Sequence, residues 1–173
     1  MTICALDLAT TTGYASVSHG IVMSGTFKCR QSSKEPWGVC FLRFKRWLRD
    51  WLFQEKPDKL YYEEVMRFSS SASAKVYCGL RAVMLLECEA HGVDAIGLSV
   101  GQIKKSFTGK GNASKQDMID IACEKYPDIK IIDDNHADSL AILELAIQNN
   151  PCTPPTTQPL KKSSSRTFLQ MDQ

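Results

Sequence analysis

The sequence lacks the features that mark a membrane, secreted or zinc-binding protein. No apolar run is long enough to span a bilayer, and no secretory signal precedes the first strand-like segment, so we expect no membrane association. None of the seven cysteines forms a Cys-x-x-Cys pair, which argues against a zinc site. Their odd number and apolar surroundings predict reduced thiols and a cytoplasmic location.

The chain also lacks a strong net charge. Its formal value is +2, so overall charge does not indicate a nucleic-acid binder. Basic residues are nevertheless gathered in two segments, and local basic patches can bind phosphates on a nearly neutral protein. The first segment contains Arg43, Lys45, Arg46 and Arg49, and the second contains Lys104, Lys105, Lys110 and Lys115.

Length and composition fit one globular domain and a tail. The 173 residues, 43% of them apolar, can build one full hydrophobic core, which we assign to residues 1–150. Residues 151–173 are rich in proline, serine and lysine, and we expect them to form a flexible tail. No internal repeat is visible.

The order of the predicted elements indicates an α/β fold with a mixed sheet. Three short strands come first, and strands then alternate with helices. We expect the three strands within residues 2–28, with a turn at residues 10–13, and further strands around Glu63 and at residues 93–98. We expect helices from residue 37 to before Pro57, over 72–91, after Ser99, over 114–126 and over 135–148.

Three carboxylates stand next to apolar segments far apart in the chain. Asp7 closes the first strand, Glu63 lies in a later one, and Asp138 precedes the apolar part of the last helix. A carboxylate on a buried element is costly unless it is paired or binds a cation. If the three converge, they form an all-oxygen site suited to Mg²⁺ or Mn²⁺ and to phosphate chemistry.

Each of these carboxylates has a simpler interpretation. Asp7 could cap the threonine-rich turn that follows it, and Asp138 could be favoured by the dipole of its helix. Glu63 could be exposed on an edge strand, and the adjacent Glu64 leaves open which of the two would bind a metal.

Four segments in the same order and at similar spacing resemble the RuvC-like Holliday junction resolvases of the RNase H-like superfamily, in particular phage-type members. The resemblance covers residues 2–149. The segments are Leu6-Asp7-Leu8-Ala9-Thr10-Thr11-Thr12-Gly13-Tyr14, Tyr62-Glu63-Glu64-Val65, Gln102-Ile103-Lys104 with Gly109-Lys110-Gly111-Asn112-Ala113-Ser114-Lys115, and His136-Ala137-Asp138-Ser139-Leu140-Ala141.

The resemblance implies an RNase H-like fold, with a central mixed five-stranded sheet flanked by helices, in a homodimer that cuts branched DNA. It implies paired symmetric nicks in four-way junctions and two Mg²⁺ or Mn²⁺ ions per site, held by Asp7, Glu63 and Asp138. Family members commonly carry an Asp or His three residues before the last ligand, where this chain has Asn135. We expect Asp134 rather than His136 to serve as the fourth ligand.

The resemblance also suggests the DNA contacts. Lys104 and Lys115 would lie near the scissile phosphate, Lys105 and Lys110 would contact the backbone, and Phe68 would wedge between bases at the junction. The lysines could instead form an ordinary solvated face, and Phe68 could be a loop residue. The segment around Gly109 is not a P-loop, because the glycine spacing and the final Lys-Ser/Thr are missing.

Three other functions remain open at this point. An RNase H-like ribonuclease acting on RNA–DNA hybrids would use the same ligands. A sugar-kinase or actin-like nucleotide binder shares the sheet, but this chain is too short for two lobes. A non-catalytic DNA-binding member of the superfamily would be expected to have lost a carboxylate, and all three are present.

Overall fold

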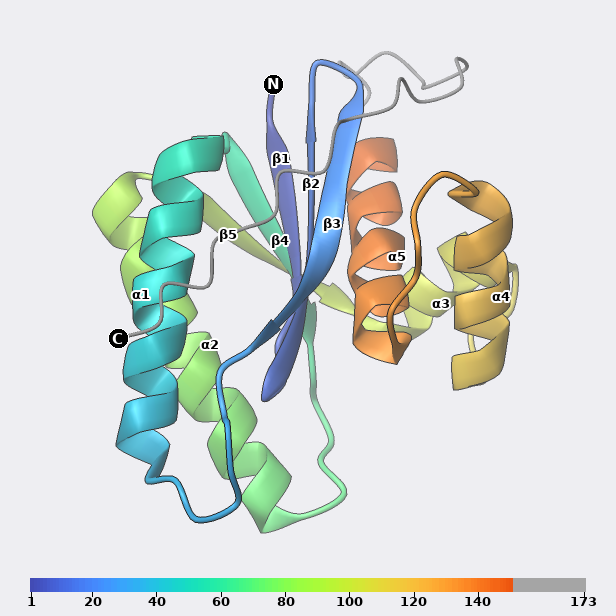
Figure 1. The fold of residues 1–173 in the computed structure, drawn as a ribbon. Helices are drawn as coiled ribbons and strands as arrows, with labels where there is room; N and C mark the ends of the chain where they lie inside the picture. Colours follow the sequence, from blue (N-terminus) through green and yellow to red (C-terminus); the bar gives the residue numbers. More distant parts are fainter. Residues whose placement is uncertain (151–173) are drawn as a thin grey trace.

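The computed structural model describes residues 1–150, which form a five-stranded mixed sheet with helices on both faces (Figure 1). The strand order is β3-β2-β1-β4-β5, with β1 antiparallel to β2 and parallel to β4. This arrangement confirms the predicted α/β class and mixed sheet. The expected tail at residues 151–173 lies outside the described residues. The strands are β1 (Ile3–Asp7), β2 (Thr11–Ser18), β3 (Ile21–Lys28), β4 (Lys59–Glu64) and β5 (Asp94–Ser99).

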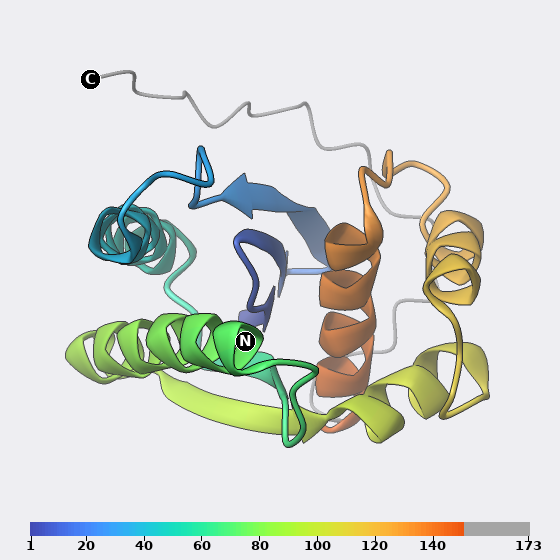
Figure 2. The same cartoon turned by 90° about the horizontal axis from the view of Figure 1, so that it is seen from below.

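The helices divide between the two faces of the sheet. Figures 1 and 2 show α1 and α2 on one face and α5 on the other, with α3 and α4 beyond α5. Two hydrophobic cores result, and side chains of β1 enter them alternately: Ile3 and Ala5 pack on the α5 side, Cys4 and Leu6 on the α1–α2 side. The helices are α1 (Trp37–Glu55), α2 (Ser71–His91), α3 (Val100–Thr108), α4 (Lys115–Lys125) and α5 (Asp134–Gln148).

The helix boundaries follow the signals in the sequence. Gly92 ends α2 in the left-handed conformation, with φ of 67°, which glycine adopts without a steric cost. Ser99 opens the helix expected after it through a capping box, in which its side chain accepts from the Gln102 amide. None of the helices within residues 1–150 combines the length and apolar composition needed to cross a membrane.

The expected turn at residues 10–13 is wrong by a few residues. Thr11 already begins β2, and the chain turns at residues 8–10 instead. The Thr12 hydroxyl donates to the Ala9 carbonyl at 2.7 Å and so closes the turn from inside the strand. Threonine is β-branched and suits a strand, which explains why a threonine run continues the sheet.

Of the tryptophans in α1, Trp47 and Trp51 belong to the hydrophobic core. Trp47 stacks on Phe27 with ring centres 4.5 Å apart, and Trp51 is 2% exposed. Trp37, at the start of the helix, is 37% exposed and lies under the guanidinium of Arg30. Trp47 and Trp51 also contact the ring of Tyr14 on β2. These aromatic contacts hold α1 against β2 and β3.

Candidate metal centre

The two strand carboxylates lie at the same end and on the same face of the sheet. The last residues paired between β1 and β4 are Leu6 and Tyr62. Asp7 directly follows Leu6, and Glu63 directly follows Tyr62. Two residues before them, Ala5 and Tyr61 pack into the α5 core. Because side chains alternate along a strand, Asp7 and Glu63 also face α5.

Helix α5 brings two more carboxylates to this end of the sheet. Its first turn lies against β2 at Gly13, which pairs with Asp7. Asp134 begins α5 and Asp138 follows one helical turn later, on a similar face. The four carboxylates therefore come from β1, β4 and α5.

Their pKa values indicate that the carboxylates act on one another. Burial raises the pKa of Asp7 well above its usual value, and the charges of Asp138, Glu63 and Asp134 raise it further. Burial and then the Asp138 charge raise the pKa of Glu63 to about 7, although Lys104 opposes the shift. Burial and then the Asp134 charge raise the pKa of Asp138 to about 6. The site thus concentrates negative charge in poorly hydrated surroundings.

The donor set fits a hard divalent cation. Carboxylate oxygens are the ligands of Mg²⁺ and Mn²⁺, and a cation would relieve the repulsion that raises these pKa values. As the side chains stand, no three His, Cys, Asp or Glu residues within residues 1–150 form a complete metal-binding cluster. Mg²⁺ usually keeps several water ligands and needs only one or two carboxylates, so the two observations are compatible.

The structure separates Glu63 from its neighbour Glu64. Glu64 faces α2, where Arg81 donates to its carboxylate at 3.1 Å. Tyr62, which lies two residues before Glu64 on the same face of β4, belongs to the α1–α2 core. Glu63, and not Glu64, therefore lies with Asp7 and Asp138.

The candidates for the fourth ligand are also separated. Asp134 stays near Asp7 and Asp138 and forms an ion pair with Lys115. His136 is 2% exposed and is therefore buried, although a histidine at the start of a helix usually lies at the surface. Its Nδ1 accepts from the Ile132 amide at 3.2 Å, and its Nε2 therefore donates to the Ser24 hydroxyl at 2.8 Å. His136 therefore interacts with β3 and not with the carboxylates.

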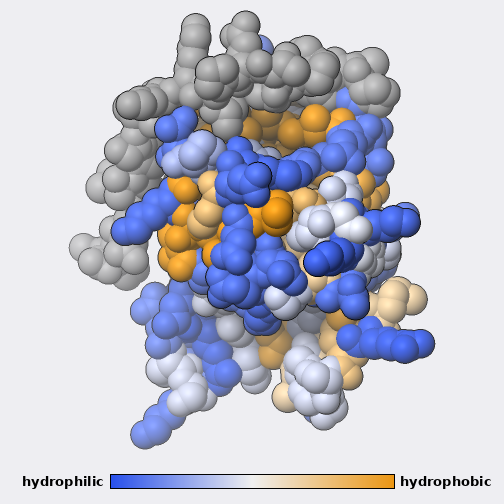
Figure 3. Space-filling view, turned by 90° about the vertical axis from the view of Figure 1, so that its right-hand side faces the viewer, coloured by the Kyte–Doolittle hydropathy of each residue, from blue (hydrophilic) through white to orange (hydrophobic). Residues whose placement is uncertain are grey.

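Of the four lysines predicted to contact DNA, two lie beside the carboxylates. Lys104 lowers the pKa values of Glu63 and Asp138, and its ammonium donates to the Ala113 carbonyl at 2.6 Å. Lys115 contacts Asp134. Lys105 and Lys110 are exposed on α3 and on the α3–α4 loop, and Figure 3 shows mainly hydrophilic side chains on that side of the molecule.

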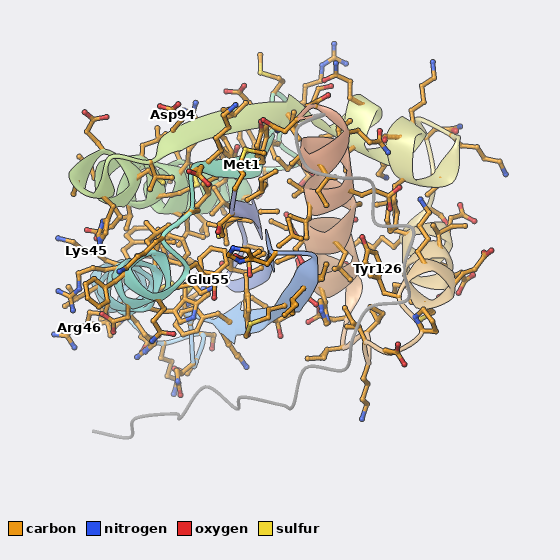
Figure 4. The ribbon with its side chains drawn as sticks, turned by 90° about the horizontal axis from the view of Figure 1, so that it is seen from above. Met1, Lys45, Arg46, Glu55, Asp94 and Tyr126 are labelled. Atoms are coloured by element: carbon orange, nitrogen blue, oxygen red, sulfur yellow. The ribbon has the colours of Figure 1, made fainter. Side chains whose placement is uncertain are left out.

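The basic residues of α1 lie elsewhere. In Figure 4, Lys45 and Arg46 point outward from α1 on the side of the molecule opposite Tyr126, which follows α4. Arg43 is neutralised by Glu35 at 2.6 Å, and Lys45 lies 3.6 Å from Glu87. This segment therefore does not extend the basic surface of α3 and α4.

Phe68 lies in the β4–α2 loop and is half-buried. Its ring packs on Tyr77 with centres 5.4 Å apart, and both line a groove of about 430 Å³. The Tyr77 hydroxyl donates to the Glu63 carbonyl at 2.7 Å and accepts from the Val65 amide at 3.2 Å. Sequence analysis missed Tyr77 and Gly13 as supports of the site, because their partners come from distant segments.

Comparisons with known proteins identify the fold. No protein-family model matches the chain, and no curated protein matches it in sequence. A structure of Thermus thermophilus RuvC in complex with a Holliday junction substrate is similar at a TM-score of 0.70 and 19% identity, covering 82% of this chain and 90% of that one. Another Thermus thermophilus RuvC structure gives 0.67, with the same identity and coverage.

A eukaryotic structure is similar over nearly the same length. The yeast mitochondrial Holliday junction resolvase Ydc2 matches at a TM-score of 0.55 and 13% identity, covering 81% of this chain and 75% of that one. The chain has the RNase H-like fold of the RuvC-type Holliday junction resolvases.

Proposed function

We propose that this protein is a divalent-metal-dependent endonuclease that resolves four-way DNA junctions. The observation that supports this most directly is the placement of Asp7 and Glu63 on adjacent parallel strands, facing Asp138 on α5. The fold is shared with a RuvC whose structure holds a Holliday junction substrate. A carboxylate cluster beside lysines suits the hydrolysis of a phosphodiester.

The roles of the residues follow from their positions. Asp7, central among the carboxylates, would hold both ions, with Glu63 on one side and Asp138 and Asp134 on the other. Two Mg²⁺ or Mn²⁺ ions, when bound, would supply an activated water and neutralise charge at the scissile phosphate. Lys104 and Lys115 would stabilise the charge that develops on that phosphate, and Lys105 and Lys110 would hold the DNA backbone farther out.

Resolution of a junction requires two nicks, so we propose a homodimer with two equivalent sites. The outer side of α2 offers an apolar contact, since Leu86 is 69% exposed there. A two-fold axis near α2 would present one site to each of two equivalent strands, which gives paired symmetric cuts.

The deciding assay compares three labelled substrates: a four-way junction, the matching linear duplex and an RNA–DNA hybrid, each with Mg²⁺ or Mn²⁺. We expect symmetric nicks in the junction alone. Cleavage of the hybrid alone would identify a ribonuclease, and no cleavage of any substrate would contradict the proposal. Asp7→Asn should bind the junction without cutting it, whereas Asp50→Asn, on the outer surface of α1, should cut normally.

A further inference from the structure

Two buried thiols face each other where the chain passes from β3 to α1. Cys29 directly follows β3, and Cys40 lies in the first turn of α1. Their sulfur atoms are 2.9 Å apart, and both residues are fully buried in the α1–α2 core. A disulfide bond has a sulfur–sulfur distance of about 2.05 Å, so the two atoms need to approach by less than about 1 Å.

A chain of hydrogen bonds holds the two thiols in this arrangement. The Cys29 thiol donates to the Thr10 carbonyl at 3.3 Å. Because a thiol carries only one hydrogen, the Cys40 thiol must then donate to the Cys29 sulfur. The Thr10 carbonyl also accepts from the Cys29 amide at 2.9 Å. Loss of both thiol hydrogens would therefore leave Cys29 attached to the turn at residues 8–10.

The thiol pair is closed to solvent, but an exposed segment borders it. Burial raises the pKa of the Cys29 thiol well above its usual value, which keeps the thiol in its unreactive protonated form. Residues 31–34, just beyond Cys29, are exposed and belong to no helix or strand (Figure 1). Exposed segments of this kind open locally at low free-energy cost, and such an opening would admit a small reagent to Cys29.

We propose that Cys29 and Cys40 form an oxidation site, at which a hydroperoxide converts the thiol pair into a disulfide bond. The Cys29 thiolate attacks one oxygen of hydrogen peroxide and breaks the O–O bond, which gives a sulfenic acid and a hydroxide ion. The hydroxide takes up the proton that Cys29 lost. The Cys40 sulfur then attacks the Cys29 sulfur, and its proton leaves with the sulfenic hydroxyl as water. Two thiols and one peroxide thus give one disulfide and two waters.

The disulfide would close a short loop of chain between β3 and α1. Cys29 and Cys40 are 11 residues apart in sequence, and a cross-link of this size restricts the unfolded chain. Oxidation should therefore stabilise the folded protein. The oxidation site is independent of the proposed nuclease function, because the two thiols lie in the α1–α2 core and the carboxylates face α5.

The test uses the full chain carrying Cys78→Ser and Cys123→Ser at its exposed thiols, and Cys152→Ser near the C-terminus. Hydrogen peroxide should lower the intact mass by about 2 Da, because two hydrogens are lost. Tryptic mapping should show the peptide containing Cys29 joined to the peptide containing Cys40. The Tm should rise by about 5–10 °C and return to its starting value in dithiothreitol.

Cys40→Ala and Cys88→Ala, each added to this protein, are a matched pair. Both remove a buried cysteine from the same core. With Cys40→Ala, peroxide should give no joined peptides and no rise in Tm, whereas Cys88→Ala should keep both responses. The peptide map of the protein without either change decides the question even if Cys40→Ala does not fold.

Three results would overturn the oxidation site. Peroxide would leave Cys29 and Cys40 reduced for as long as the protein is folded, or it would add oxygen to one of them without joining the two. In the third case it would join a different pair of the same core, such as Cys4 and Cys88. None of these results would bear on junction cleavage, which the substrate assay above tests separately.

Discussion

Gly13 lies directly against the backbone of Asn135. A β-carbon at position 13 would lie 1.9 Å from the Asn135 carbonyl oxygen, so only glycine permits this approach. The contact sets how closely the first turn of α5 approaches β2. It therefore also sets the distance of Asp134 and Asp138 from Asp7.

Gly13→Ala should push α5 away from the sheet. We expect a loss of about 1–3 kcal/mol in the free energy of unfolding, as for other overpacked core positions. Junction cleavage should fall more than junction binding, because the carboxylates separate while the lysine surface remains. Urea denaturation and single-turnover cleavage would measure both effects.

Gly38→Ala is the matched control for that substitution. Nothing lies within 4 Å of a β-carbon built at Gly38, near the start of α1. Alanine there should leave cleavage unchanged and stability equal or slightly higher. Equal behaviour of the two variants would refute the role of the Gly13 contact.

Glu63→Gln and Glu64→Gln should differ sharply despite their adjacency. We expect Glu63→Gln to reduce cleavage by more than the roughly 10- to 100-fold typical of losing an outer-shell partner at a metal site. Glu64→Gln removes only a partly exposed ion pair with Arg81 and should cost about 0–1 kcal/mol of stability, with normal cleavage. An inactive Glu64→Gln beside an active Glu63→Gln would reverse the assignment.

The carboxylate cluster predicts that the metal-free protein loses stability as pH rises. Glu63 has a usual pKa of 4.5 and a folded value of about 7, so the folded state binds more protons than the unfolded state between these values. Stability from this group is therefore present below pH 4.5 and is lost as pH rises through 7. Asp138 adds the same trend up to about pH 6.

Mg²⁺ should oppose that loss. Thermal unfolding in chelator should show a lower Tm at pH 8 than at pH 6, and Mg²⁺ should raise the Tm far more at pH 8. At 100 times its dissociation constant, an ion that binds only the folded state stabilises it by about 2.7 kcal/mol. Asp7→Asn should raise the metal-free Tm at pH 8 and abolish most of the Mg²⁺ effect. If Mg²⁺ leaves the Tm unchanged at both pH values, the proposed metal site is excluded.

His136 predicts the opposite pH trend. Burial lowers its pKa below 6.5, so the folded state resists protonation and the histidine's contribution to stability is lost as pH falls below 6.5. The stability advantage of wild type over His136→Gln should therefore shrink between pH 7 and pH 5. Urea unfolding of both proteins from pH 7 to pH 5 would measure this difference.

Sequence patterns predicted the elements well because their signals are local. The glycine cap at Gly92 and the capping box at Ser99 act within a few residues, and both boundaries are confirmed. Local patterns could not decide whether Glu63 or Glu64 lies with Asp7. Central strand β4 is covered on both faces, with Tyr61 and Tyr62 each 3% exposed, so alternation of polarity carries no signal there.

Burial of His136 was not accessible either, because it depends on an interaction across the fold. Its partner Ser24 lies on β3, 112 residues earlier in the chain. A histidine at a helix start gives no local sign of such a partner. The pairing of Gly13 with Asn135 is equally remote in sequence, and only the folded chain brings the two together.

The two hydrogen bonds of the Tyr77 hydroxyl connect α2 with the backbone on either side of Glu64. A displacement of α2 along its axis would therefore pull on the peptide unit that carries Glu63. A change at the outer surface of that helix, such as association with a second subunit, would therefore be transmitted through these hydrogen bonds to the Glu63 side of the carboxylate cluster.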